Sequence, residues 1–74
     1  MKIPKEIEEK FYEGLTSDKT KFGINASVSI LNGPHQGEGG SVISIIAVKP
    51  QTKYLVELAN GSEIQINETE LAPL

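Results

Sequence analysis

The sequence feature that most constrains the fold is a glycine-rich stretch at residues 28–42, which reads VSILNGPHQGEGGSV. It begins with alternating apolar and polar residues, passes through a segment with four glycines and a proline, and ends at the start of an apolar run. A chain that reverses direction tightly needs positive φ angles, which glycine adopts without steric cost. The pattern therefore predicts a strand, a long loop and a second strand.

The residues after this loop have the periodicity of further short strands. Residues 41–48 are mostly apolar and rich in β-branched side chains, and a change of phase near Ile43 and Ser44 predicts a β-bulge. Two alternating segments follow at residues 53–58 and 63–66. Residues 67–70 (NETE) have the spacing of a capping box, which predicts one helical or 3-10 turn before a short closing strand.

The hairpin between the third and fourth predicted strands has two possible registers. A two-residue turn would place apolar and charged residues on the same face, which the period of two excludes. A three-residue loop at residues 59–61, with its glycine in the left-handed conformation, pairs Val56 with Ile64. A loop at residues 60–62 instead pairs Leu58 with Ile64. Both keep the apolar residues together, so both remain open.

The N-terminal residues predict a short helix at residues 4–13, with Pro4 at a position where its missing N–H is no loss. Apolar residues recur every four positions and form one stripe: Ile3, Ile7, Phe11 and Leu15. A helix of about ten residues is not stable alone in water, so the stripe is expected to dock on the sheet, with partner binding as the alternative. Polar residues 16–21 predict a linker or exposed turn. We therefore divide the chain into a helix and linker, residues 1–21, and a barrel, residues 22–74.

These elements predict a mainly β fold. The expected architecture is a small barrel of about five short antiparallel strands, with a short N-terminal helix and a 3-10 turn before the last strand. Such a barrel resembles the SH3-like small barrels. Within that class, residues 28–42 resemble the KOW motif of ribosomal and transcription-elongation proteins, whose glycine, proline and valine places are filled here by Gly33, Pro34, Gly37, Gly40 and Val42.

The KOW resemblance implies nucleic-acid binding in translation or transcription, but the loop departs from the motif. His35 and Gln36 stand where the family carries aromatic and basic residues, and Glu38 adds a negative charge. The family's RNA contacts therefore do not carry over to these positions. The C-terminal pattern, at residues 56–71, equally resembles SH3-like accessory subunits of larger redox and photosynthetic complexes, which act as docking pieces.

The charge distribution also argues against nucleic acid as a partner. Residues 1–21 contain five lysines and five acidic residues, whereas from residue 22 onward two lysines oppose five glutamates, and the chain has no arginine. An acidic barrel disfavours attraction to phosphate backbones. The chain also lacks cysteine, a long apolar span and the apolar region of a signal peptide, so we expect a cytoplasmic protein without disulfides that does not insert into membranes.

No residues form a recognisable catalytic constellation. His35 is the only histidine, and with Glu38 it is the strongest candidate for an acid–base pair or a metal site. The neighbouring loop residues supply no further strong ligand, so solvated side chains are the favoured interpretation. The glycine loop also lacks the Lys-Ser/Thr of a P-loop and the spacing of a dinucleotide fingerprint. We expect no enzyme activity, cofactor or metal site.

Two function classes remain. The first is a small interaction module that acts as an accessory piece of a larger protein assembly, and the second is a KOW-type nucleic-acid-binding domain. For the first class, loops on a rigid barrel are the expected contact sites, and the candidate partner-binding residues are Asn32, Pro34, His35, Gln36 and Glu38. Self-association through apolar residues at expected solvent positions (Leu31, Ile43 and Leu55) is a third possibility, for which cover by the N-terminal helix is the simpler explanation.

Overall fold

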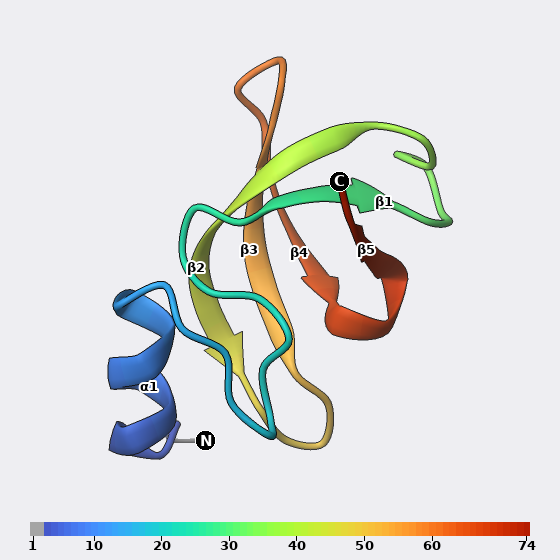
Figure 1. Cartoon of the computed structure of the whole chain (residues 1–74). Coiled ribbons are helices and arrows are strands. Elements are labelled where there is room, and N and C mark those ends of the chain that lie inside the picture. Colours follow the sequence, from blue (N-terminus) through green and yellow to red (C-terminus); the bar gives the residue numbers. More distant parts are fainter. Residues whose placement is uncertain (1–2) are drawn as a thin grey trace.

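The computed structural model describes residues 3–74 and is mainly β, as predicted (Figure 1). Its elements in chain order are α1 (Lys5–Tyr12), β1 (Ser27–Ile30), β2 (Gly39–Ala47), β3 (Lys53–Leu58), β4 (Glu63–Asn67), the 3-10 turn η1 (Glu68–Glu70) and β5 (Leu71–Pro73). The helix, the five strands and the turn before the last strand confirm the predicted fold class. Residues 1 and 2 of the predicted N-terminal segment lie outside the described residues. Within the described part of the chain, no helix has the length and apolar character needed to cross a membrane.

The five strands form one antiparallel sheet in the order β4-β3-β2-β1-β5. The long strand β2 is strongly curved in Figure 1 and pairs with both β1 and β3. The β2–β3 register shifts between Val42 and Ser44 and again between Ile45 and Ala47. Because bulges bend a strand and increase its twist, these shifts help the sheet to curl. The first shift confirms the predicted bulge, and the curled sheet fits a small barrel-like fold.

The β3–β4 hairpin adopts the first of the two registers left open by the sequence. Val56 pairs with Ile64, and Glu57 lies directly opposite Glu63. The loop closes with a hydrogen bond of 2.9 Å from the Gly61 N–H to the Leu58 carbonyl, and Gly61 has a φ of 89°. The register that pairs Leu58 with Ile64 is therefore wrong.

The hydrophobic core lies between the curled sheet and the N-terminal segment. Phe11 is fully buried, and its ring stacks on that of Tyr54 with the ring centroids 6.0 Å apart. Ile7 packs partly against the same core. The helix is thus docked on the sheet, as predicted. Leu15, however, is 52% exposed, because α1 ends at Tyr12 and Gly14 (φ 80°) turns the chain away.

The segment predicted as a linker or exposed turn is only partly exposed. Thr20 is 1% exposed, and its hydroxyl lies 2.8 Å from that of Ser17, which satisfies this buried polar group. The Thr52 hydroxyl donates to the Lys19 carbonyl at 2.6 Å. Residues 17–20 are therefore held against the β2–β3 loop by hydrogen bonds that the local sequence does not reveal.

Glu68 joins three segments of the chain through one carboxylate oxygen. The backbone N–H of Lys21 donates to Glu68 Oε2 at 2.7 Å, and the Tyr54 hydroxyl donates to the same atom at 2.5 Å. Burial of Tyr54, together with this hydrogen bond and the nearby carboxylate charge, raises the pKa of the Tyr54 hydroxyl. The capping-box interaction predicted for η1 is not formed, since the Asn67 side chain makes no cap hydrogen bond and the Glu68 N–H donates to the Thr52 carbonyl instead.

Candidate interaction surface

The glycine-rich loop between β1 and β2 has a defined backbone conformation. At its base the Gly37 N–H donates to the Ile30 carbonyl at 2.8 Å, and the Ile30 N–H donates to the Glu38 carbonyl at 3.0 Å. At its tip the Gln36 N–H donates to the Gly33 carbonyl. Gly33 and Gly37 have φ values of 85° and 88°, which other residues rarely adopt. The turns of the loop therefore account for both glycines.

A cavity of about 250 Å³ lies between this loop, β4 and η1, and we call it the β4 slot. The Leu31 N–H donates to the Glu70 carbonyl at 2.9 Å and so fixes the start of the loop beside η1. Three isoleucines and a proline form the apolar part of the lining, and two amides, an imidazole and a carboxylate form the polar part. The slot is lined by Ile30, Asn32, Gly33, Pro34, His35, Ile64, Gln65, Ile66 and Glu70.

The structure brings three of the five predicted partner-binding residues to the slot: Asn32, Pro34 and His35. Gln36 and Glu38 lie on the same loop, are exposed, and do not line the slot. The His35 Nδ1 atom lies 3.0 Å from Glu38 Oε2, and the two side chains are 37% and 46% exposed. Glu38 thus contacts the ring that lines the slot. Among residues 3–74 no group of three or more His, Cys, Asp or Glu side chains is arranged to hold a metal ion.

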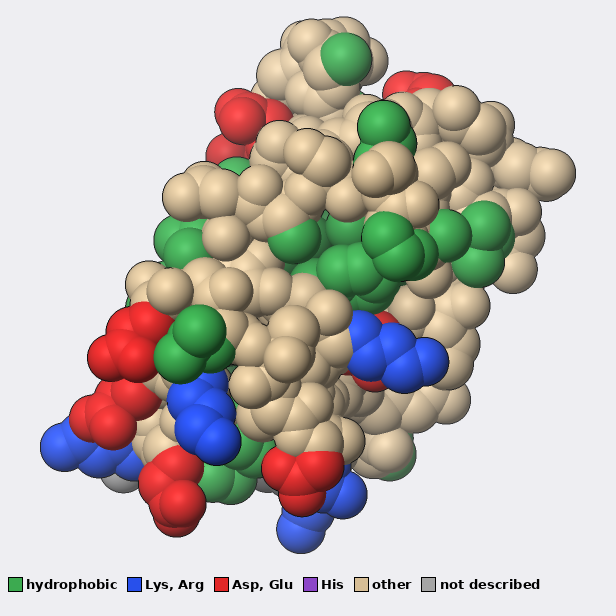
Figure 2. Space-filling view, in the orientation of Figure 1, with side chains coloured by type: hydrophobic (Ala, Val, Ile, Leu, Met, Phe, Trp, Pro, Cys, Tyr) green, Lys and Arg blue, Asp and Glu red, His purple; other side chains and the backbone are tan. Residues whose placement is uncertain are grey.

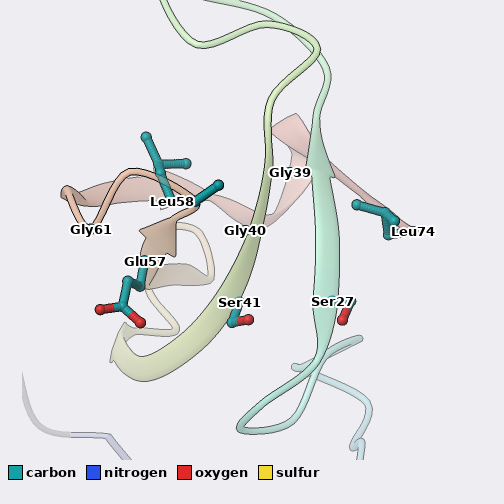
Figure 3. A pocket seen from close by; sticks show the side chains of 9 residues that line it. Ser27, Gly39, Gly40, Ser41, Glu57, Leu58, Gly61 and Leu74 are labelled. Carbon is teal, nitrogen blue, oxygen red and sulfur yellow. The ribbon is translucent and has the colours of Figure 1, made fainter.

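A larger hollow, about 570 Å³, lies elsewhere, between the β1–β2 strands and the β3–β4 hairpin. Figure 3 shows that backbone forms much of its surface at Gly39, Gly40 and Gly61, with the side chains of Glu57 and Ser41 at one side. A Cβ on Gly40 would lie 2.7 Å from Val56 Cγ1 and 2.8 Å from the Glu57 carbonyl oxygen. Close packing of β2 against β3 therefore requires this glycine.

Charged side chains are segregated along the β3–β4 hairpin. Lys53 pairs with Asn67 at one end of the ladder, and Glu57 pairs with Glu63 at the other. A smaller cavity of about 250 Å³ at the first end is lined in part by two lysines, Lys49 and Lys53.

On the face shown in Figure 2, charged side chains concentrate around α1 and the neighbouring segment, and a band of hydrophobic side chains crosses the molecule at the level of β1.

The apolar residues considered for self-association have different environments. Ile43 and Leu55 are half-buried, and the Tyr12 hydroxyl at the end of α1 lies 3.0 Å from the Ser44 hydroxyl next to Ile43. Leu31 is 48% exposed, so the N-terminal helix does not cover this residue as expected.

Sequence reasoning missed Ile64, Gln65 and Glu70 as slot residues because they lie about 30 residues from the loop. Comparison with protein-family models, with curated proteins and with solved structures gives no match.

Proposed function

We propose that this protein is a small, non-enzymatic interaction module of the SH3-like class that serves as an accessory piece of a larger protein assembly. Its strand order and the 3-10 turn before β5 support the class. The observation that carries the proposal is the β4 slot, in which Asn32, Pro34 and His35 lie beside β4, a strand at the edge of the sheet. Loops held on a rigid scaffold are common sites of recognition.

The size of the slot favours a protein partner over a small molecule. Pockets for drug-sized ligands and cofactors have volumes of roughly 300–1,000 Å³. The slot, at about 250 Å³, is smaller and offers room for a few side chains. A partner protein would insert such side chains there and make its remaining contacts on the surrounding loop and strand.

Affinity capture with two variants tests the proposal. The tagged parent chain, an Asn32→Ala/His35→Ala double variant and a Gln36→Ala control are each incubated with lysate of the natural host, and bound proteins are quantified by mass spectrometry. Gln36 is exposed on the same loop but outside the slot. All three chains should unfold within about 0.5 kcal/mol of one another, as exposed substitutions usually do.

A protein recovered by the parent and by Gln36→Ala, but depleted with the double variant, supports the proposal. A set of recovered proteins that is the same for all three chains counts against it. The KOW-type alternative would instead use the lysine-lined cavity at Lys49 and Lys53. It ranks second because the formal net charge is −3 and the chain has no arginine.

A further inference from the structure

We propose that the β4 slot accepts an extended segment of the partner protein, which carries Lys or Arg side chains and adds to the free edge of β4 as an additional strand. This inference rests on the proposed function and specifies the chemistry of the partner. It stands on three observations: the unpaired backbone of β4, the position of the slot along that backbone, and the glutamates around it.

The backbone of β4 has hydrogen-bonding groups directed away from the sheet. β4 is an edge strand, and its ladder with β3 begins with a 2.8 Å bond from the Leu58 N–H to the Ser62 carbonyl. Because hydrogen-bonded and non-hydrogen-bonded pairs alternate in an antiparallel ladder, the N–H and C=O groups of Glu63, Gln65 and Asn67 point outward. Within residues 3–74 these groups make no backbone hydrogen bond outside the sheet. Such an edge can pair with a strand of another chain.

The slot lies along this edge. In a strand, successive side chains point to opposite faces, so Ile64 and Ile66 share one face and Gln65 lies on the other. The burial agrees, since Ile66 is 8% exposed and Gln65 is an exposed residue. A cavity lined by all three consecutive residues must therefore border the edge of the strand. Pro34 and His35 of the loop line the same cavity and would flank an added strand.

The charges around the edge favour a basic segment. Glu63 lies directly opposite Glu57 on β3, both are exposed, and like charges in such a pair are destabilising. Neither glutamate makes an ion pair in the part of the chain that the structure describes. Glu70 lines the slot itself. A Lys or Arg side chain on an added strand would be attracted to these carboxylates, whereas a second copy of this acidic chain would bring more glutamates to the same edge.

Peptide selection on the full chain tests the inference. A phage library of random 12-residue peptides is selected against the parent, and enriched peptides are synthesised for binding measurements by fluorescence polarisation. We expect enriched peptides with Lys or Arg at alternate positions. Gln65→Pro removes an outward N–H that the β3–β4 ladder does not use, which an edge strand can tolerate. This variant should bind at least about tenfold more weakly, through lost hydrogen bonds and steric conflict.

A charge-matched pair of variants tests the role of the glutamates. Glu63→Gln/Glu70→Gln should weaken binding by about three- to tenfold at low salt, since each exposed charge pair contributes only modestly to affinity. Glu6→Gln/Glu9→Gln on α1 removes the same charge away from the slot and should leave the affinity unchanged. Thermal unfolding checks that each variant is folded. If Gln65→Pro does not fold, peptides that are N-methylated at alternate residues test the same strand pairing. Their methylated nitrogens cannot donate hydrogen bonds to the β4 carbonyls.

Several results would overturn the inference. They are the absence of enriched peptides, enriched peptides without basic residues, and affinity that is unaffected by both Gln65→Pro and peptide N-methylation. Binding that is lost in Asn32→Ala/His35→Ala but retained in the Gln65 and Glu63/Glu70 variants would reject the added basic strand and leave the proposed function intact. A dimer of the parent that Gln65→Pro dissociates, measured by sedimentation velocity, would identify a second copy as the occupant and also reject the inference.

Discussion

Replacing Tyr54 with Phe removes a single oxygen atom that joins β3, η1 and the segment before β1. The Tyr54 hydroxyl donates to Glu68 Oε2 at 2.5 Å and accepts a long hydrogen bond of 3.4 Å from the Phe22 N–H. The ring packing on Phe11 is retained in the variant. A hydrogen bond to a charged group contributes about 1.5–3 kcal/mol. We therefore expect Tyr54→Phe to lower the free energy of unfolding by about that amount at pH 7.

The same hydroxyl makes the effect depend on pH. Burial, the hydrogen bond to Glu68 and the charge of Glu68 raise the pKa of Tyr54 above its ordinary value of 10.0. Above about pH 10 the unfolded chain therefore releases a proton that the folded chain retains, so stability falls with rising pH. The contribution is complete below pH 10 and decreases by up to about 1.4 kcal/mol for each pH unit above it. Because Tyr54→Phe lacks this contribution, the stability difference between the parent and the variant should shrink above pH 10.

Urea unfolding followed by circular dichroism at pH 7, 9, 10.5 and 11 measures both effects. Tyr12→Phe is the matched control, because Tyr12 is 46% exposed and its hydroxyl lies within hydrogen-bond distance of the exposed Ser44 hydroxyl. The control should change the free energy of unfolding by less than about 0.5 kcal/mol at pH 7. A Tyr54→Phe cost below about 0.5 kcal/mol, or a stability difference that stays constant from pH 9 to pH 11, would refute the role assigned to this hydroxyl.

Three further predictions follow from burial, close contacts and charge. Phe11→Ala should cost about 3–5 kcal/mol in urea unfolding, whereas Leu15→Ala, at an exposed position, should cost less than about 0.5 kcal/mol. Gly40→Ala should cost about 1–3 kcal/mol because the new Cβ clashes with Val56 and with the Glu57 backbone. Gly39→Ala should cost less because its one tight contact is with the exposed Leu74 side chain; equal costs would contradict this. Single- and double-stranded oligonucleotides should not bind at physiological salt, and a salt-sensitive micromolar complex in a filter assay would favour the KOW-type alternative.

The strands could be predicted from the sequence because each strand buries one face, so apolar residues recur at every second position. The hairpin register could not, since both three-residue loops keep the apolar residues on one face. The structure adopts the register that places Glu57 against Glu63. An unfavourable pair of exposed charges costs only about 0.2–1 kcal/mol, so this pair is too weak to exclude the register.

The environment of residues 16–21 could not be predicted because its causes are not local. Polar composition favours an exposed segment, and Thr20 on its own has no reason to be buried. It becomes buried because Thr52 binds the neighbouring Lys19 carbonyl and Glu68 binds the Lys21 N–H, contacts that span 33 and 47 residues of the chain. Those distant partners also explain why η1 forms without the side-chain cap that its sequence suggests.

The candidate site shows the same division between local and non-local causes. The glycine-rich sequence predicted the loop. In the structure, Gly33 and Gly37 are needed for the positive φ angles of the turns, and Gly40 is needed for the close contact with β3. These glycines therefore carry no information about a partner. Asn32 differs, because within residues 3–74 its side chain makes no hydrogen bond and yet lines the slot. In that same part of the chain, the His35 side chain makes its hydrogen bond to the exposed Glu38. The fold does not need the side chains of Asn32 and His35, and both lie beside a strand edge with unpaired backbone. A binding role is therefore expected for these two residues of the loop.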